Sequence, residues 1–426
     1  MTRLHETKAG KRAERAVAVG LVLPSVPSHI AEEHLDELRK LIETAGGEPV
    51  ATIVQERQAP DPATWIGKGK AEEVQATVEE KEAGLVVFDD DLSPAQIRNL
   101  EKIISAKVVD RSGLILDIFA SRARSREART QVELAQLQYL LPRLTRQWTH
   151  LSRQAGGIGT RGVGETQLEI DRRIIRTRIS RLRRELERIE KNRETQRLGR
   201  AGTFTVALVG YTNAGKSTLF NRLTAGSALA ENKLFATLDA KVQKAADPMP
   251  RETVVVDTVG FVRKLPHHLV ASFRSTMEEA ASADLVLHLV DLSHADYLEH
   301  LEVGKQVLLD LGIPRDRVFE VFNKIDRFAG PLSRDRDTIA VSAVTGENVD
   351  VMLDMIRRRE ISQGRTLHLR IPIEESRSIA RVHELGQVHE QSQADGHYSF
   401  LVWLPEEAIY QFSPYLSPED RDVVDP

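Results

Sequence analysis

The stretch Gly210-Tyr211-Thr212-Asn213-Ala214-Gly215-Lys216-Ser217 matches the pattern G-x-x-x-x-G-K-[ST] at every fixed position. An apolar, β-branched run at 203–209 precedes it and predicts a buried strand, and residues 218–223 predict a helix after it. In this order the glycines let backbone N–H groups close around phosphate oxygens at a helix N-terminus. We expect Lys216 to reach the terminal phosphates of a nucleotide and Ser217 to offer its hydroxyl to Mg²⁺.

A second motif follows the predicted strand 253–256 and reads Asp257-Thr258-Val259-Gly260. Asp257 is placed to hold Mg²⁺ through a water molecule, and the backbone N–H of Gly260 is placed to meet a γ-phosphate. A magnesium nucleotide is therefore the predicted ligand.

The base is indicated by Asn323-Lys324-Ile325-Asp326, which follows the predicted strand 317–322. The carboxylate of Asp326 can accept hydrogen bonds from both N1–H and the exocyclic amine of guanine. Adenine lacks this pair of donors, so the motif favours GTP over ATP. Ser342-Ala343, after the predicted strand 338–341, completes the base pocket through a backbone contact to the guanine oxygen.

Bulk composition sets limits on the rest of the chain. Its 426 residues suggest roughly three domains. No stretch approaches the roughly 20 apolar residues of a membrane span. The start, 1–28, superficially resembles a signal peptide, but its apolar run is short, so we expect a first strand there. The absence of cysteine excludes disulfides, thiolate catalysis and Cys-ligated zinc, and the thirteen histidines show no metal-ligand spacing.

Charge is unevenly distributed along the chain. Residues 121–200 carry twenty Lys/Arg against nine Asp/Glu, a net charge of +11, which leaves −15 for the remainder of a total of −4. A basic segment beside a nucleotide switch suggests a polyanionic partner, and a solvated charged helix is the alternative.

The first part of the chain, 1–110, alternates predicted strands and helices and forms a small α/β domain. Ser93, Pro94 and Gln96 have the spacing of a capping box at a helix start. Gly67-Lys68-Gly69-Lys70 could hold an anion and Asp89-Asp90-Asp91 a metal, but we interpret both as surface loops.

Residues 111–200 predict a long antiparallel helical hairpin. Two apolar stripes at 3-4 spacing support it, and Pro142 should kink or end the first helix. The stripes are Leu134, Leu137, Leu141, Leu144 and Trp148, and Ile175, Ile179, Leu182, Leu186 and Ile189.

The joint between the two helices, 152–166, contains five glycines and two arginines. Such a tip cannot bury a core, but it can lay backbone amides and guanidinium groups against phosphates. A flexible linker is the alternative, and the length of the joint favours a functional tip. The candidate RNA-binding residues are Arg153, Gly156, Gly157, Gly159, Arg161, Gly162 and Gly164.

The remaining residues predict two further domains. Residues 201–362 have the alternation of a doubly wound sheet around the phosphate loop, and 363–413 form a small C-terminal α+β domain. The acidic end, 414–426, is expected to be disordered. The predicted fold class is thus a multidomain α/β protein.

With these motifs in place, the chain resembles the HflX family, within the translation-factor-related branch of Ras-like P-loop GTPases. The nucleotide motifs carry the wider resemblance, and residues 110–120, 131–137 and 156–169 carry the resemblance to HflX. Val163 departs from the proline expected in many members. The resemblance covers nearly the whole chain.

The resemblance implies a nucleotide site and a switch. Thr237 should bind Mg²⁺ only when the γ-phosphate is present, and Lys216, Thr237 and Gly260 are the expected catalytic residues. The implied nucleotide-binding residues are Gly210, Tyr211, Thr212, Asn213, Ala214, Gly215, Lys216, Ser217, Thr218, Phe235, Ala236, Thr237, Leu238, Asp239, Asp257, Thr258, Val259, Gly260, Asn323, Lys324, Ile325, Asp326, Ser342, Ala343 and Val344.

The resemblance also bears on hydrolysis. Phe261 stands where other GTPases place a glutamine that orients water, so we expect slow hydrolysis that ribosomes stimulate. Asn213 resembles the asparagine that ligates K⁺ in several relatives, and a role in stabilising the loop is equally open.

For partners, the resemblance implies the large ribosomal subunit and its rRNA near the peptidyl-transferase centre, and a role in splitting or rescuing stalled ribosomes under stress. It also suggests that the N-terminal domain touches rRNA or a second nucleotide. We expect a cytoplasmic protein, partly ribosome- or membrane-associated, without membrane insertion and monomeric when free. The alternative is a GTP-dependent regulatory switch that recruits a protein or membrane partner through its helical arm.

Overall fold

The computed structural model describes residues 13–24, 26–144, 167–198, 203–224, 226, 234–235, 238, 240–249, 251–264, 279–330 and 338–424. These residues form two compact units. The first comprises Met1–Ile189, Asn232–Leu238 and Val262–Arg274. The second comprises Glu190–Glu231, Asp239–Phe261 and Ser275–Pro426.

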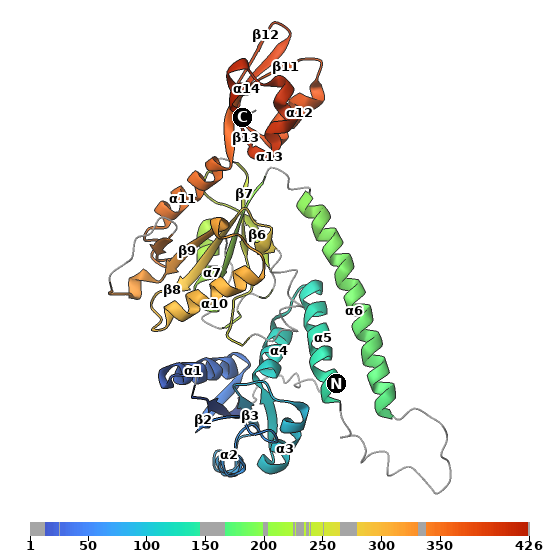
Figure 1. Cartoon of the computed structure of the whole chain (residues 1–426), viewed down its shortest axis with the longest axis vertical. Coiled ribbons are helices and arrows are strands. Elements are labelled where there is room, and N and C mark those ends of the chain that lie inside the picture. The colour runs from blue at the N-terminus through green and yellow to red at the C-terminus, as the bar shows by residue number, and fades with distance from the viewer. Residues whose placement is uncertain are drawn as a thin grey trace. The chain divides into compact units, whose positions relative to one another are not determined.

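The first unit contains a four-stranded parallel sheet in the order β2-β1-β3-β4, with helices packed against it (Figure 1). Its core includes Val17, Val86 and Leu100, all fully buried. The strands are β1 Glu14–Val22, β2 Gly47–Glu56, β3 Leu85–Phe88 and β4 Lys107–Asp110, and the helices are α1 Ser28–Thr44, α2 Lys68–Glu80 and α3 Pro94–Ile104. The predicted first strand and small α/β fold are confirmed.

The predicted capping box at the start of α3 is present. The N–H of Gln96 donates to the Ser93 hydroxyl over 3.3 Å, and the N–H of Ser93 donates to the Gln96 side chain over 2.8 Å. Because Pro94 has no N–H to satisfy, its place in the first turn costs nothing.

The two loops that resembled ligand sites are held by protein contacts. Asp89 accepts from Arg111 over 2.6 Å and from Lys264 over 2.8 Å. Ser112 donates to Asp91. At the start of α2, Lys68 and Lys70 pair with carboxylates of their own helix at 3.9 Å and 2.6 Å. Both stretches therefore have partners within the protein. The interpretation of both as surface loops is wrong in part, because Lys68, Gly69 and Lys70 form the first turn of α2 and Asp89 is buried.

Three helices follow the first sheet: α4 Arg111–Arg122, α5 Arg126–Leu140 and α6 Gln167–Leu198. The α5 helix ends at Leu140, and Leu141–Arg143 form a 3-10 turn around Pro142, as predicted. The placement of Leu144 on the helical stripe is wrong, because Leu144 lies beyond α5 and the 3-10 turn that follows it, although its N–H still donates to the Leu140 carbonyl over 3.0 Å. Trp148 lies outside the described residues.

The apolar stripes of α5 and α6 pack together. Leu134, Ile179 and Leu182 form their buried centre, and Leu137, Ile175 and Leu186 flank it. Two ion pairs reinforce the contact: Arg126 with Glu185 at 2.7 Å, and Arg178 with Glu133 at 2.7 Å. The predicted antiparallel packing is thus present between α5 and the part of α6 from Ile175 to Leu186.

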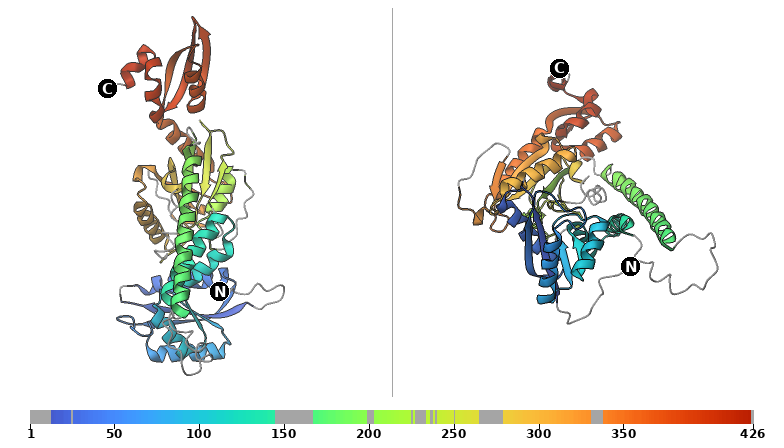
Figure 2. Two further views of the ribbon diagram at one scale, coloured as in Figure 1. Left: turned by 90° about the vertical axis from the view of Figure 1, so that its right-hand side faces the viewer. Right: turned by 60° about the horizontal axis from the view of Figure 1, so that its bottom comes forward.

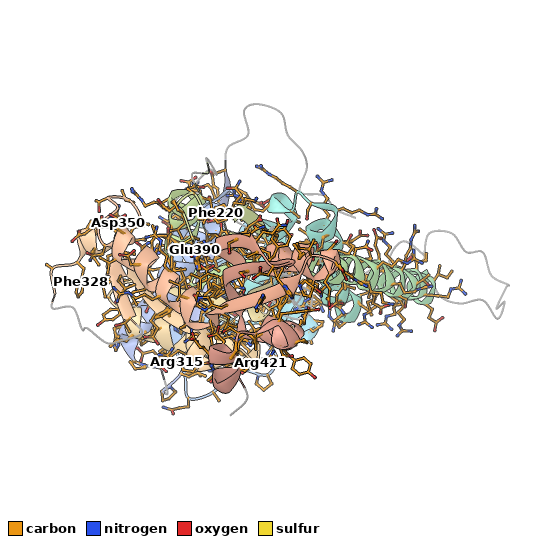
Figure 3. All side chains as sticks on the ribbon, turned by 90° about the horizontal axis from the view of Figure 1, so that it is seen from above. Phe220, Arg315, Phe328, Asp350, Glu390 and Arg421 are labelled. Atoms are coloured by element: carbon orange, nitrogen blue, oxygen red, sulfur yellow. The ribbon has the colours of Figure 1, made fainter. Side chains whose placement is uncertain are left out.

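The second unit contains a six-stranded sheet in the order β10-β9-β8-β5-β7-β6. Its strands run parallel except β6, which pairs antiparallel with β7 at the edge. The core includes Leu208, Phe220 and Leu287, and Figure 3 labels Phe220. The elements are β5 Phe204–Gly210, α7 Lys216–Thr224, β6 Lys241–Lys244, β7 Thr253–Asp257, β8 Leu285–Asp291, α10 Tyr297–Asp310, β9 Val318–Asn323, β10 Thr338–Val341 and α11 Val349–Ser362.

The same unit ends in a small antiparallel sheet in the order β11-β13-β12, with helices on one side of it (Figure 2). The buried Phe400, Val402 and Phe412 centre its core. The elements are β11 Gly364–Pro372, α12 Ser376–Leu385, β12 Gln387–Ala394, β13 His397–Pro405, α13 Glu406–Ile409, the 3-10 turn Tyr410–Tyr415 and α14 Pro418–Val424. The predicted α+β fold is present.

The expectation of a disordered end is wrong as far as Val424. Leu416 is buried in the core, and Pro418 begins the helix α14. The Asp420 carboxylate accepts from the N–H of His368 over 2.7 Å, and the N–H of Ser417 donates to the His368 carbonyl over 2.9 Å. These bonds extend the edge of β11, so the acidic segment has an ordered place.

Within the part of the chain that the structure describes, the helices are too short or too polar to span a membrane.

Candidate nucleotide site

The phosphate loop connects β5 to α7 as predicted. Gly210 has φ +144°, and a Cβ there would lie 2.2 Å from the carbonyl oxygen of Leu289. Gly215 has φ +94°, and a Cβ there would lie 2.2 Å from the Asn323 side-chain nitrogen. Both glycines are therefore required by backbone conformation and by close approach. Asn213 also has a positive φ of 64°, which asparagine tolerates better than most residues.

Lys216 is buried, and its ammonium group donates to the carbonyl oxygens of Gly210 and Tyr211 over 3.0 Å and 2.9 Å. Burial lowers its pKa to about 8, against the opposing effect of Asp257. The side chain is thus folded back along the loop whose amides would surround phosphate. Added phosphate charge would favour the protonated lysine.

Ser217 and Asp257 bring together the oxygen ligands that Mg²⁺ prefers. The Ser217 hydroxyl donates to the Asp257 carboxylate over 2.8 Å, and Asp257 is fully buried at the end of β7. A hydroxyl and a carboxylate beside a phosphate loop fit a magnesium ion that keeps several of its waters. When bound, Mg²⁺ would neutralise charge on the phosphates.

Thr258 and Gly260 position the backbone that follows Asp257. The Thr258 hydroxyl donates to the Leu208 carbonyl over 2.7 Å, which ties this segment to β5. A Cβ on Gly260 would lie 2.8 Å from the Lys216 ammonium nitrogen. It would also lie 2.9 Å from the Cα of Thr212, a backbone atom, so any larger residue would force the two segments apart. Phe261, buried at 4% exposure, donates its N–H to the Gly210 carbonyl over 2.9 Å, accepts from the Thr212 N–H over 2.7 Å and presents an apolar ring.

The predicted base-binding residues also converge. Asn323 donates to the Ala214 carbonyl over 2.8 Å and accepts from the Ala343 N–H over 2.9 Å. Asp326 accepts from the Ser342 hydroxyl over 2.6 Å. Asn323 thus connects the phosphate loop with the loop after β10.

Two contributors were missed from the sequence. Asp291, at the end of β8, forms an ion pair with Lys324 at 2.6 Å. This contact fixes the position of the Lys324 side chain. Arg222, on α7, donates to the carbonyl oxygens of Ala343 and Val344 over 2.9 Å and 2.7 Å. The position of Asp291 at the carboxyl end of a predicted parallel strand was a usable indication, because ligand sites gather at that edge. Arg222 had no comparable indication.

The segments that flank the nucleotide motifs have partners within the first unit. Phe235, with φ +54°, packs edge-on against Phe119 with ring centroids 4.6 Å apart. The Arg263 carbonyl accepts from Arg111 over 3.2 Å. Leu238 is buried. Ala236, Thr237 and Asp239 lie outside the described residues, as do all the candidate RNA-binding residues: Arg153, Gly156, Gly157, Gly159, Arg161, Gly162 and Gly164.

A glycine loop between strand and helix, a buried lysine, a hydroxyl–carboxylate pair and an N-K-x-D motif on one sheet edge define the class of P-loop GTPases. The comparisons agree. Residues 32–120 match the family model described as GTP-binding GTPase N-terminal, 122–200 the GTP-binding GTPase Middle Region, and 205–324 the 50S ribosome-binding GTPase.

Proteins named GTPase HflX are similar over most of the chain. The one from Magnetococcus marinus is 46% identical over 402 residues, which cover 92% of each chain. The one from Escherichia coli is 44% identical over 88% of this chain and 90% of its own. The solved complex of SsGBP with GDP is 25% identical, covers 81% of this chain and 98% of its own, and has a TM-score of 0.46. The chain belongs to the HflX family of GTPases, and it is a GTP hydrolase.

Proposed function

We propose that this GTPase binds the large ribosomal subunit through its basic helical arm and uses its GTP-dependent switch to split or rescue stalled ribosomes. The arm is α5, α6 and the residues between them. The protein would act in the cytoplasm, as a monomer when free. The name of the matching family model, 50S ribosome-binding GTPase, supports the choice of partner.

The observation that carries the proposal is the surface of α6. One face of this helix packs on α5 through Ile179 and Leu182. Six arginines are exposed in the part of α6 whose side chains the structure describes, and Figure 3 shows nitrogen-tipped side chains projecting along the helix. They are Arg173, Arg176, Arg181, Arg183, Arg184 and Arg188. A surface with this excess of arginines, in which Glu169 and Glu187 are also exposed, suits the phosphate backbone of RNA, whereas a docking face for a protein would be more apolar.

In the proposed reaction, residues of this chain mainly position groups and neutralise charge. Lys216 would release the loop carbonyls and contact the terminal phosphates, while Ser217, Thr237 and a water on Asp257 would hold Mg²⁺. The Gly260 N–H would meet the γ-phosphate. Phe261 cannot hydrogen-bond to water, so we expect slow hydrolysis until the ribosome completes the site. Asn213 is proposed as a K⁺ ligand, a role that equal rates in K⁺ and Na⁺ buffers would exclude.

The glycine tip is proposed to contact rRNA through Arg153, Arg161 and the amides of Gly156, Gly157, Gly159, Gly162 and Gly164. The test is the GTP hydrolysis rate with and without large ribosomal subunits. We expect strong stimulation that is lost when Arg153 and Arg161 are both replaced by alanine. As a matched control, Arg358→Ala with Arg377→Ala removes the same charge from exposed positions of the second unit and should leave stimulation intact.

Absence of stimulation in the unaltered protein would overturn the ribosomal assignment and leave the GTPase. Stimulation that survives the tip substitutions would remove the tip from the proposal. Stimulation lost equally in the control would show that total charge, and not the tip, is responsible.

A further inference from the structure

Arg222 connects the two ends of the nucleotide site within the second unit. It lies on α7, the helix that begins with Lys216 at the phosphate loop. Its Nε donates to the carbonyl of Ala343 over 2.9 Å, and its Nη2 donates to the carbonyl of Val344 over 2.7 Å. The planar guanidinium thus spans two successive carbonyls of the loop after β10, a geometry that lysine cannot reproduce.

The loop that Arg222 holds is organised around Ser342. The N–H of Gly346 donates to the Ser342 carbonyl over 2.8 Å, and the N–H of Thr345 donates to the Ser342 hydroxyl over 3.1 Å. The same hydroxyl donates to Asp326 over 2.6 Å. On the opposite side, the N–H of Ala343 donates to Asn323 over 2.9 Å. Ala343 is therefore fixed at its N–H by Asn323 and at its carbonyl by Arg222.

Gly346 gives an independent sign that the loop is shaped around the guanidinium. Its φ is +92°, and a Cβ on it would lie 2.6 Å from Nη1 of Arg222. A side chain at this position would strain the backbone and push Arg222 away. The sequence thus supplies both the arginine and the space that it occupies.

We propose that Arg222 is a positioning residue for guanine: it fastens the Ser342–Val344 loop to the phosphate-loop helix and so slows nucleotide release. This inference rests on the proposed contact between that loop and the guanine oxygen. Arg222 does not touch the base in this scheme. It holds the backbone that does, at a fixed distance from the helix that follows the phosphate loop.

The test is the dissociation rate of fluorescently labelled GDP from the full-length protein, measured by stopped flow with excess unlabelled GDP. Arg222→Ala should release GDP about tenfold faster, since two charge-assisted hydrogen bonds at an exposed site are lost. Arg222→Lys should recover part of the loss. Gly346→Ala should act in the same direction, because it displaces the guanidinium without removing charge.

Two measurements separate positioning from general damage. Arg357 also donates to a backbone carbonyl, that of Pro248 over 3.2 Å, so Arg357→Ala should leave GDP release unchanged. Labelled IDP keeps the base oxygen but lacks the amine that Asp326 would bind. Arg222→Ala should therefore accelerate IDP release by the same factor as GDP release, whereas damage spreading to Asp326 would affect GDP more.

Wild-type release of GDP from folded Arg222→Ala and Gly346→Ala variants would overturn the positioning role. A larger factor for GDP than for IDP would also overturn it. If the unaltered protein bound ADP as tightly as GDP, the base-pocket assignment itself would fail, and that outcome is visible before any variant is made.

Discussion

The Ser217 hydroxyl donates a hydrogen bond of 2.8 Å to the carboxylate of Asp257, joining the start of α7 to the end of β7. A carboxylate in this position binds Mg²⁺ and its waters, whereas the uncharged amide of asparagine would bind them much more weakly. We expect Asp257→Asn to lower single-turnover GTP hydrolysis about 100-fold or more and to raise the Mg²⁺ concentration required. Asp350→Asn, at an exposed position of α11, is the control. Full activity of Asp257→Asn, or activity that persists in EDTA, would contradict the magnesium site.

Lys216 leads to a prediction about proton uptake. Burial lowers its pKa to about 8 in the free protein, and bound phosphates would raise it again. Above pH 8 the free protein therefore holds this lysine neutral and the complex holds it charged. GDP binding at pH 8.5–9 should take up a proton, and affinity should weaken as pH rises through this range. Calorimetry in buffers of different ionisation enthalpy measures the uptake, which Lys216→Met should abolish.

The same lysine bears on stability without nucleotide. Its pKa in the folded protein lies below the ordinary lysine value of 10.5, so the unfolded chain binds more protons between the two values. This group's contribution to the free energy of unfolding therefore rises as pH increases from about 8 to about 10.5. Lys216→Met should remove that contribution. An unaltered pH dependence in the variant would show that other groups determine it.

Glu360 should make the free energy of unfolding fall, and not rise, with increasing pH, and it should do so at lower pH than Lys216. It is fully buried, accepts from the Arg251 N–H over 2.9 Å, and burial raises its pKa to about 7 from 4.5. The folded state thus binds the proton more tightly, and the free energy of unfolding should fall as pH rises from about 4.5 to 7. Glu360→Gln should flatten this decline, by up to about 3 kcal/mol. The decline persisting in the variant would contradict the assignment.

Trp403 offers the probe for that experiment. Arg251 lies over its ring, 5.2 Å from the centroid, and the Trp403 indole donates to the Ile361 carbonyl over 3.2 Å. The chain has three tryptophans, so fluorescence measured with Trp65 and Trp148 replaced by phenylalanine reports on the region around Glu360 during urea unfolding. Arg251→Ala is the companion variant. It should destabilise the protein at pH 8 by about 3 kcal/mol, because it leaves the buried carboxylate without its cation.

Sequence reasoning placed the nucleotide motifs well because each lies where a strand ends. Once the strand ending at Asp257 and the strand ending at Asn323 were recognised, parallel pairing brought their loops to one edge of the sheet. Arg222 escaped notice because its role depends on which loop faces α7, and that is a tertiary fact. An arginine on a helix surface has no local pattern that distinguishes it from a solvated one.

Two of the errors had local causes. Periodicity placed Leu144 on a helix, although the geometry of Pro142 ends that helix first. Composition predicted disorder after residue 413, although Leu416 supplies a buried anchor and Asp420 a hydrogen-bond acceptor for β11. Hydrophobic periodicity and composition are averages over many residues, so they do not register the effect of one residue. In both places single residues determined the structure.

Asp110 accepts the hydrogen bonds that join the start of α4 to Tyr139 at the end of α5 and to Arg143 in the turn that follows. It is fully buried, caps α4 through the N–H of Gly113 over 2.8 Å, and accepts from Tyr139 over 2.6 Å and Arg143 over 2.7 Å. Burial, with Asp110 nearby, raises the pKa of Tyr139, so its hydroxyl remains a donor.

Asp110→Asn keeps the size of this side chain but replaces one acceptor with a donor and leaves Arg143 without its counter-charge. We expect a loss of about 3 kcal/mol in the free energy of unfolding. We also expect faster hydrogen exchange at the first turn of α4 and in Leu141–Arg143. If the arm carries the ribosome contact, stimulation by large subunits should fall more than unstimulated hydrolysis, because Arg143 precedes the tip.

Asp117→Asn is the matched control on the same helix. Burial raises the pKa of Asp117, which means that its charged form is already disfavoured, so replacing it should cost little or stabilise the protein slightly. Equal losses in the two variants would show that any substitution on α4 is damaging. A loss confined to Asp110→Asn would show that the position of the arm depends on one carboxylate and the four donors around it: Leu92 N–H, Gly113 N–H, the Tyr139 hydroxyl and Arg143.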